Sequence, residues 1–317
     1  MPPTTPQLDQ LIGWQGLTVT VPGDWSVGAV SGDKNEGYLR LDGADLPRLE
    51  VRWSQSKGAP DLGKTVQKYL TSLQRDKKQP QPVTVDAESR FLSKRKVNKD
   101  DMRAFTWTGH QAGYGVVWYC KACSRVIIAQ ALGRPDEKNL EDRAVKLLSS
   151  LEDHPRGDWT TWSLYDLHTE IPKDFDQSGV NLRAGLTELT FKRDTEKIVV
   201  ARWGMAEIAR HGQSLDAWAR RQFQKQWQSF HPLGDPTTFR DHEALTVTGA
   251  STQPLGLVVR LGRHVARKVY ADQLVAHIWH CEPTNRLYVV YGIVDVANRP
   301  LLEEIRDRTR CHLIDSG

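Results

Sequence analysis

Two stretches of the chain that lie 150 residues apart share a pattern, and this repeat restricts the fold more than any other feature. Residues 17–25 read LTVTVPGDW, and residues 167–175 read LHTEIPKDF. Further matches follow in the same order: Leu39 with Leu189, Arg52 with Arg202, Trp53 with Trp203, and the WYC of 118–120 with the WHC of 279–281. An ordered set of matches is typical of a tandem duplication. We therefore expect two domains, residues 1–155 and 156–317.

Each copy is expected to combine strands with two helices. Leu17, Val19 and Val21 alternate with polar residues, which is the period of a half-buried strand. The apolar period becomes helical near 62–73 in the first copy and near 215–227 in the second. Further strands are expected around 104–108, 116–120 and 125–132, and a closing helix ends each copy. The expected fold class is α+β, with two tandem copies of an antiparallel sheet covered by helices.

The turn after the first strand of each copy carries a family resemblance. It reads Pro22-Gly-Asp-Trp25 in copy one and Pro172-Lys-Asp-Phe175 in copy two. With a helix placed between two sets of strands, this order resembles the PsbP/Mog/DcrB-like fold. The resemblance implies a non-catalytic family that includes photosystem assembly subunits, Ran-binding factors, lipoproteins and adaptor chaperones. It carries over no functional residue.

Composition and charge exclude several classes of protein. The longest apolar runs, 116–120 and 287–291, are far shorter than the ~18 residues of a transmembrane helix. The first ten residues lack the basic and apolar regions of a signal peptide, so we expect a cytoplasmic protein without a membrane span. The formal net charge is only +4, from 43 Lys and Arg against 39 Asp and Glu, which disfavours a nucleic-acid partner.

Cysteine and histidine recur near one point of each copy. Cys120 and Cys123 form a C-x-x-C motif at the tip of an expected hairpin, and the closing helix should bring His154 back towards it. In copy two the same path brings Cys311 and His312 back towards His280 and Cys281. These seven residues are the candidate ligands of a metal ion, with zinc as the candidate cofactor.

Other roles for these residues stay open. A free cysteine is often a small buried apolar residue, and a histidine that ends a helix interacts with the helix dipole without any metal. A Cys281–Cys311 disulfide is a third option, disfavoured in a reducing compartment. Cys281 with His280 or His312 would make a nucleophile and a base, but no orienting group or oxyanion element is recognisable.

Paired tryptophans and one basic cluster complete the candidate features. Trp53 and Trp203, like Trp118 and Trp279, stand at matching positions, which indicates core packing. The basic cluster lies in copy two alone and is a candidate partner-binding site: Arg260, Arg263, His264, Arg267 and Lys268. It could bind an acidic partner, a phosphate backbone or a membrane surface, but a solvated face is the favoured interpretation because the net charge is small.

No phosphate-binding loop, dinucleotide fingerprint, nucleophile elbow or zinc-protease motif occurs. We therefore expect a binding, scaffold or adaptor-chaperone protein without catalysis, acting on a protein partner and needing no cofactor. The alternative is a metal-binding or redox-responsive protein that uses the Cys/His clusters with zinc. The sequence gives no indication of a small-molecule ligand.

Overall fold

The computed structural model describes residues 9–76, 80–92, 101–251 and 271–312. The chain divides into two compact units, unit 1 (residues 1–157) and unit 2 (residues 158–317), and each is considered by itself. The basic cluster at 260–268 lies outside the described residues. Among the described residues, no helix is both long enough and apolar enough to cross a membrane.

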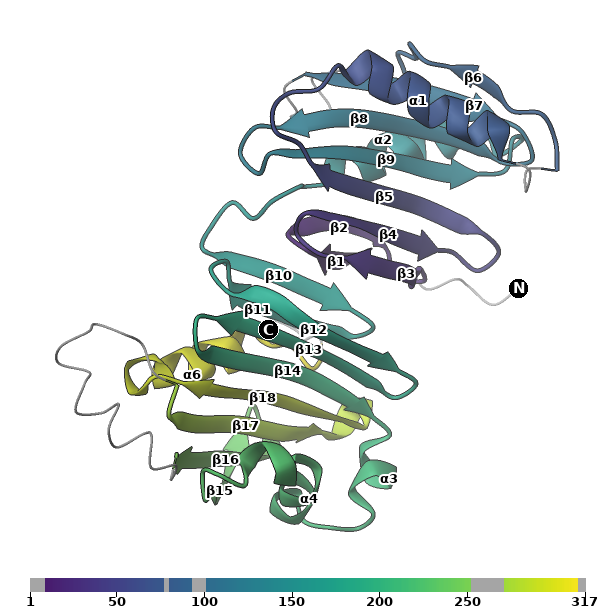
Figure 1. Ribbon diagram of the computed structural model, residues 1–317. Coiled ribbons are helices and arrows are strands. Elements are labelled where there is room, and N and C mark those ends of the chain that lie inside the picture. Colours follow the sequence, from purple (N-terminus) through teal and green to yellow (C-terminus); the bar gives the residue numbers. More distant parts are fainter. Residues whose placement is uncertain (1–8, 77–79, 93–100, 252–270, 313–317) are drawn as a thin grey trace, which may run out of the picture. The chain divides into compact units, whose positions relative to one another are not determined.

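Unit 1 is built around a seven-stranded antiparallel sheet with the strand order β3-β4-β5-β9-β8-β7-β6 (Figure 1). Its elements are, in chain order, β1 (Asp9–Trp14), β2 (Leu17–Pro22), β3 (Ser26–Gly32), β4 (Glu36–Asp42), β5 (Pro47–Gln55), α1 (Leu62–Arg75), β6 (Thr84–Asp86), β7 (Met102–Thr108), β8 (Ala112–Cys120), β9 (Arg125–Gly133) and α2 (Leu140–Ser150).

The two helices of unit 1 lie on opposite faces of its sheet (Figure 1). Helix α1 begins at the cap Asp61, whose side chain accepts a hydrogen bond from the backbone N–H of Lys64. Its apolar stripe, which includes Val66 and Leu70, packs in one cluster with Phe105. On the other face, α2 contacts β8, β9 and the hairpin strand β2. The β1–β2 hairpin and α2 therefore share the cover of this face.

Unit 2 repeats the same strand order, β12-β13-β14-β18-β17-β16-β15. Its elements are β10 (Trp159–Leu164), β11 (Leu167–Pro172), β12 (Asp176–Arg183), β13 (Leu186–Arg193), β14 (Glu196–Gly204), α3 (Ala206–Arg210), α4 (Leu215–Trp227), β15 (Leu233–Phe239), β16 (His242–Ala250), β17 (Gln273–Cys281), β18 (Arg286–Val294) and α6 (Arg299–Arg308), with short 3-10 turns at Glu282–Thr284 and Val296–Asn298.

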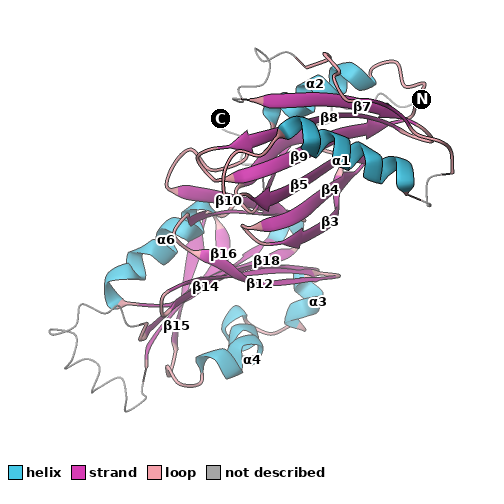
Figure 2. Cartoon of the chain, turned by 45° about the horizontal axis from the view of Figure 1, so that its top comes forward, coloured by secondary structure: helices cyan, strands magenta, loops and turns pink. Residues whose placement is uncertain are grey.

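The expectation of sheets covered by helices is wrong. Strands make up about half of the described chain, and the fold is β-rich (Figure 2). The physical reason is that a hairpin replaces a helix over half of one sheet face. In unit 2, Trp162 of β10 packs edge-on against Phe191 of β13 with ring centroids 4.9 Å apart. Alternating strand residues give such a hairpin one apolar face, which the sheet buries.

Trp53 and Trp203, which match in sequence, do not occupy equivalent positions in the two sheets. Trp53 of β5 pairs with Ile127, whereas Trp203 of β14 pairs with Leu287. In this part of the chain, equivalent residues of the two units lie 161 positions apart, so Tyr288 is the counterpart of Ile127. Tyr288 pairs with Arg202, and Arg202 is therefore the counterpart of Trp53. The register differs because seven residues separate the paired Leu41 and Leu49, but six separate Phe191 and Ile198.

A shift of one residue turns a side chain to the other sheet face. Trp203 consequently packs against α4, with ring centroids 5.3 Å from Trp218 and 5.9 Å from Phe223. Trp53 instead donates its indole N–H to the backbone carbonyl of Asp33, at 2.8 Å. Trp118 and Trp279 keep matching positions, and both are fully buried.

Candidate metal centres

In unit 1 a hairpin end and the segment after α2 meet at one point. Cys120 is the last residue of β8, and Cys123 lies in the turn to β9, which closes through Ser124 at a φ of +54°. Asp153 and His154 follow α2. Their segment is fixed by two backbone hydrogen bonds between Glu152 and Thr18, at 2.8 and 3.0 Å.

The four side chains of unit 1 converge closely. One donor atom from each of Cys120, Cys123, Asp153 and His154 lies within 4.8 Å of every other. Cys120 Sγ is 3.4 Å from His154 Nδ1, and that nitrogen is 3.0 Å from Asp153 Oδ1. The second carboxylate oxygen of Asp153 accepts a hydrogen bond from the Trp118 indole N–H at 2.7 Å. This bond orients the carboxylate, as hydrogen bonds commonly do for metal ligands.

Burial disfavours the charged form of one thiol in this cluster. It raises the pKa of the Cys123 thiol to about 12, with further contributions from the hydrogen bond to Cys120 and the nearby Asp153. Arg125 interacts electrostatically with the cluster; burial lowers the pKa of its guanidinium, which donates to the carbonyls of Lys34 and Gln15 at 2.8 Å. A bound divalent cation would supply the charge that favours both thiolates.

In unit 2 a third segment joins the corresponding elements. Cys281 is the last residue of β17, while Cys311 and His312 follow α6. The segment after α6 is fixed by the Arg310 backbone N–H, which donates to the His168 carbonyl at 3.0 Å. His242 begins β16, directly after a tight turn at 240–241 in which both residues have positive φ.

The donor atoms of unit 2 lie equally close. His312 Nδ1 is 3.3 Å from Cys281 Sγ and 3.2 Å from Cys311 Sγ. Cys311 Sγ is also 3.5 Å from His242 Nε2, and all four donor atoms lie within 4.8 Å of one another. The two sulfurs of this centre are shielded from solvent, since Cys281 is 0% and Cys311 5% exposed, whereas His312 is partly exposed.

Burial in unit 2 favours the neutral form of two of the ligands in the absence of a cation. It raises the pKa of Cys311 to about 11, helped by Cys281, and it lowers the pKa of His242, helped by His312. A neutral imidazole is the form that binds a metal, whereas the thiols must lose their protons.

Three ligand positions correspond between the units and the fourth does not. Cys120 corresponds to Cys281 because each pairs with the arginine that begins the next strand. Asp153 and His154 correspond to Cys311 and His312, since both pairs directly follow the residue bridged to β2 or β11. The fourth position is filled by Cys123 from the hairpin turn in unit 1 and by His242 from a neighbouring strand in unit 2.

Of the seven residues expected to bind metal, six lie in these clusters, and His280 does not. It alternates with Cys281 along β17 and therefore points to the other sheet face. There its Nδ1 lies 3.2 Å from an Arg210 nitrogen, and Arg210 also pairs with Glu243. All four cysteines are free thiols, so the Cys281–Cys311 disulfide is not formed.

Sequence reasoning missed Asp153 and His242. Asp153 directly precedes a candidate ligand, which was a usable signal. The β16–β17 register pairs Glu243 with His280 and so places His242 beside Cys281. Side chains alternate between the two faces of a strand, and applying this rule to the hairpin would have replaced His280 by His242 in the predicted ligand set.

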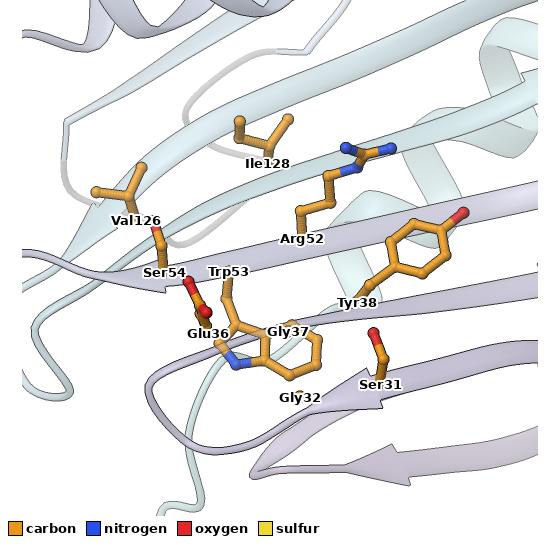
Figure 3. A pocket seen from close by; sticks show the side chains of 10 residues that line it. All are labelled: Ser31, Gly32, Glu36, Gly37, Tyr38, Arg52, Trp53, Ser54, Val126 and Ile128. Atoms are coloured by element: carbon orange, nitrogen blue, oxygen red, sulfur yellow. The ribbon is translucent and has the colours of Figure 1, made fainter.

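A separate hollow of about 610 Å³ lies on the sheet of unit 1 (Figure 3). Its walls come from β3, β4, β5 and β9, on the face where Val126 packs near α1. Arg52 lies over the Tyr38 ring at 5.2 Å, and the Tyr38 hydroxyl donates to Glu50 at 2.6 Å. The Tyr38 hydroxyl and the Arg52 guanidinium are therefore both engaged in contacts within the unit.

No protein-family profile and no curated protein matches the sequence. Similar solved structures include a chain of the crystal structure of the Tle4–Tli4 complex, with 12% identity and a TM-score of 0.35 over 96% of this chain and 97% of that chain. The apo structure of the immunity protein TplEi of the T6SS from Pseudomonas aeruginosa matches with 10% identity and a TM-score of 0.34, over 97% of this chain and 98% of that chain. The same immunity protein complexed with "L" peptide gives 10% identity and a TM-score of 0.32 at the same coverage.

TM-scores this low do not establish a common fold, so these likenesses assign no function to the present chain. None of the three structures is described as a PsbP/Mog/DcrB-like protein, and that resemblance is unconfirmed.

Proposed function

We propose that the chain is a metal-binding protein in which each unit is held together by one zinc ion. The observation that carries this proposal is the convergence of four donor side chains at the corresponding place of both units. In each case the donors come from segments about thirty residues or more apart in sequence, so local chain geometry alone does not explain their meeting.

Simple packing accounts poorly for the contacts in unit 2. His312 Nδ1 has one hydrogen-bonding site but faces two sulfurs, at 3.3 and 3.2 Å. A neutral imidazole nitrogen can satisfy only one thiol through its single lone pair. A metal ion at the centre of the four donors would bind all of them at once.

The donor set favours zinc. Two sulfurs with two imidazoles, in unit 2, are a common tetrahedral zinc set, and unit 1 offers two sulfurs, one imidazole and one carboxylate. Zn–S bonds of about 2.3 Å and Zn–N bonds of about 2.0 Å place tetrahedral ligand atoms about 3.3–3.8 Å apart. The sulfur–nitrogen separations of 3.2–3.5 Å in the structure need little adjustment.

The role of the metal would be structural. Four protein ligands fill a tetrahedral zinc ion and leave no open position for water or substrate. Each ion would join the tip of a central hairpin to the segment that follows the closing helix. Its binding free energy would add to the free energy of folding.

The test is metal analysis of the full chain after zinc reconstitution. We expect two zinc ions per chain, and one in Cys281→Ser or in Cys120→Ser. His280→Gln is the matched control, because this residue is next to Cys281 but on the other sheet face, and it should keep both ions. Wild-type protein that binds no zinc and melts at the same temperature with and without a chelator would refute the proposal.

A protein partner is the second candidate function, and the hollow on β3–β5 favours it because, among the described residues, helix α1 has its main contacts with β7 and β8 and leaves this part of the sheet face more open. An Arg52→Glu variant reverses a charge at its rim without touching either Cys/His cluster. A partner captured in stoichiometric amount by the wild type and lost by the variant supports binding there. A partner held equally by both proteins excludes this surface.

A further inference from the structure

The two clusters differ in how far solvent reaches their sulfur atoms. Cys120 and Cys123 are both half-buried, and the His154 side chain is 38% exposed. Cys281 and Cys311 are buried, as is His242, while His312 is partly exposed. A small oxidant dissolved in water therefore reaches the thiolates of unit 1 more readily than those of unit 2.

The clusters also differ in how their cysteines are connected. Cys120 and Cys123 belong to one hairpin turn, so bringing their sulfurs together moves only that turn. Cys281 and Cys311 belong to separate segments. The carbonyl of Cys311 accepts a hydrogen bond from the buried Tyr288 hydroxyl at 3.1 Å, which holds its backbone in place. A disulfide in unit 2 would link two segments thirty residues apart, one of which is anchored in this way.

We propose that the unit 1 centre is a redox-sensitive zinc site, which releases its metal when peroxide oxidises Cys120 and Cys123 to a disulfide. This inference rests on the proposed function, since it requires zinc to be bound there. The unit 2 centre keeps its metal under the same conditions and preserves the fold of its own unit.

The chemistry balances with hydrogen peroxide as the oxidant. One zinc-bound thiolate attacks a peroxide oxygen, the O–O bond breaks, and a sulfenic acid forms while the released hydroxide takes a proton to become water. The second thiolate attacks the sulfenic sulfur, forms the S–S bond and releases hydroxide, which takes a second proton. Two thiolates lose two electrons, peroxide gains them, and two waters are produced. Zinc keeps only Asp153 and His154 as ligands, too few to hold it.

The surrounding hydrogen bonds keep the change confined to the site. After release, the Trp118 bond to Asp153 and the Thr18–Glu152 backbone bonds still hold the segment, so the change stays local and reversible.

The experiment measures zinc released from the fully loaded chain by hydrogen peroxide, with a colorimetric zinc indicator. We expect one of the two ions to be released and the peptide containing Cys120 and Cys123 to carry an internal disulfide in mass spectrometry. Dithiothreitol with added zinc should restore the second ion. Cys281→Ser should hold one ion that peroxide releases, and Cys120→Ser should hold one ion that peroxide leaves in place.

The outcomes separate this inference from the proposal on which it rests. Two bound ions that both resist peroxide, or that leave together, overturn the redox role and leave zinc binding intact. Release of zinc from Cys120→Ser also overturns it. A wild-type chain that never binds zinc overturns both. The disulfide measurement uses wild-type protein, so it does not depend on any variant folding.

Discussion

Cys120 Sγ lies 3.4 Å from His154 Nδ1, although 34 residues separate the two along the chain. Unit 2 reproduces this relationship between Cys281 and His312 at 3.3 Å. In both units the contact joins the end of a central strand to the segment after the last helix. The contact therefore ties together two elements that the sheet hydrogen bonds do not connect directly.

Chelation should destabilise the protein. A ligand that binds only the folded state stabilises it by about 4 kcal/mol when present at ~1,000 times its dissociation constant. We expect a chelator to lower the melting temperature of the wild type by several degrees, as followed by circular dichroism. The double variant Cys120→Ser/Cys281→Ser should start lower and show no further drop; a drop of the same size in that variant would count against metal ligation by these cysteines.

Trp118→Phe should weaken metal binding in unit 1 alone. The change keeps an aromatic ring but removes the indole N–H that orients Asp153, at 2.7 Å. Loss of such an outer hydrogen bond typically lowers metal affinity by about 10–100-fold. Competition with a chromophoric chelator measures the affinity of each site.

The matched control for this variant is Trp107→Phe. It also loses a buried indole hydrogen bond, to Gln130 at 2.9 Å, but the bond lies away from the Cys/His cluster. Equal losses of affinity in the two variants would point to general destabilisation of unit 1 and not to the orientation of Asp153.

Stability should fall in mild acid because of His277. Burial lowers the pKa of His277 to about 4, and the nearby Arg306 adds to this effect. The unfolded chain has a histidine pKa of about 6.5, so between those values it binds more protons than the folded protein. The stabilising contribution of neutral His277 is complete above about pH 6.5 and is lost as the pH falls towards 4, with roughly 2 kcal/mol lost by pH 5.

Urea unfolding at pH 7.5 and pH 5 measures this loss. His277→Gln keeps a polar group near Thr246 but does not titrate, so its stability should fall less than that of the wild type between the two pH values. The difference between the two proteins isolates His277 from the metal ligands, which also respond to acid. Parallel losses in both proteins would show that other groups cause the acid sensitivity.

Glu196 should be a major contributor to the stability of unit 2. Its side chain is 1% exposed, and it accepts hydrogen bonds from the Asp295 backbone N–H at 2.9 Å and from the Asn298 amide at 2.7 Å, besides an ion pair with Arg193. Leaving a buried hydrogen-bond donor unsatisfied costs about 1–3 kcal/mol. Glu196→Ala should lose at least that much in urea unfolding, whereas the exposed Glu303→Ala should change stability by less than ~0.5 kcal/mol.

Much of the element order could be predicted from the sequence, because apolar periods of two and of 3.6 mark strands and helices in this chain. Residues 62–73 and 215–227 were expected to be helical, and they lie within α1 and α4. The cover of the sheet could not be predicted in this way. A strand with one apolar face, such as β2, has the same pattern whether it joins a large sheet or packs across it as a separate hairpin.

The candidate sites, too, could be predicted from the sequence only in part. Sequence order alone indicates that His154 and His312 return towards a hairpin end, since a closing helix must run back along the sheet. The choice between His280 and His242 depends on which sheet face a side chain occupies, and a period of two resolves it only when the register of the partner strand is known. Metal binding itself stays a prediction.

The single extra residue between β4 and β5 has a consequence for anyone who recombines the two units. Exchanging only the β13–β14 hairpin into unit 1 would carry Trp203 onto the face next to α1, where the partner rings of Trp218 and Phe223 are missing. The smallest interchangeable segment is therefore a hairpin together with its helix, and chimeras cut between these elements should fold poorly even though the strand order is the same.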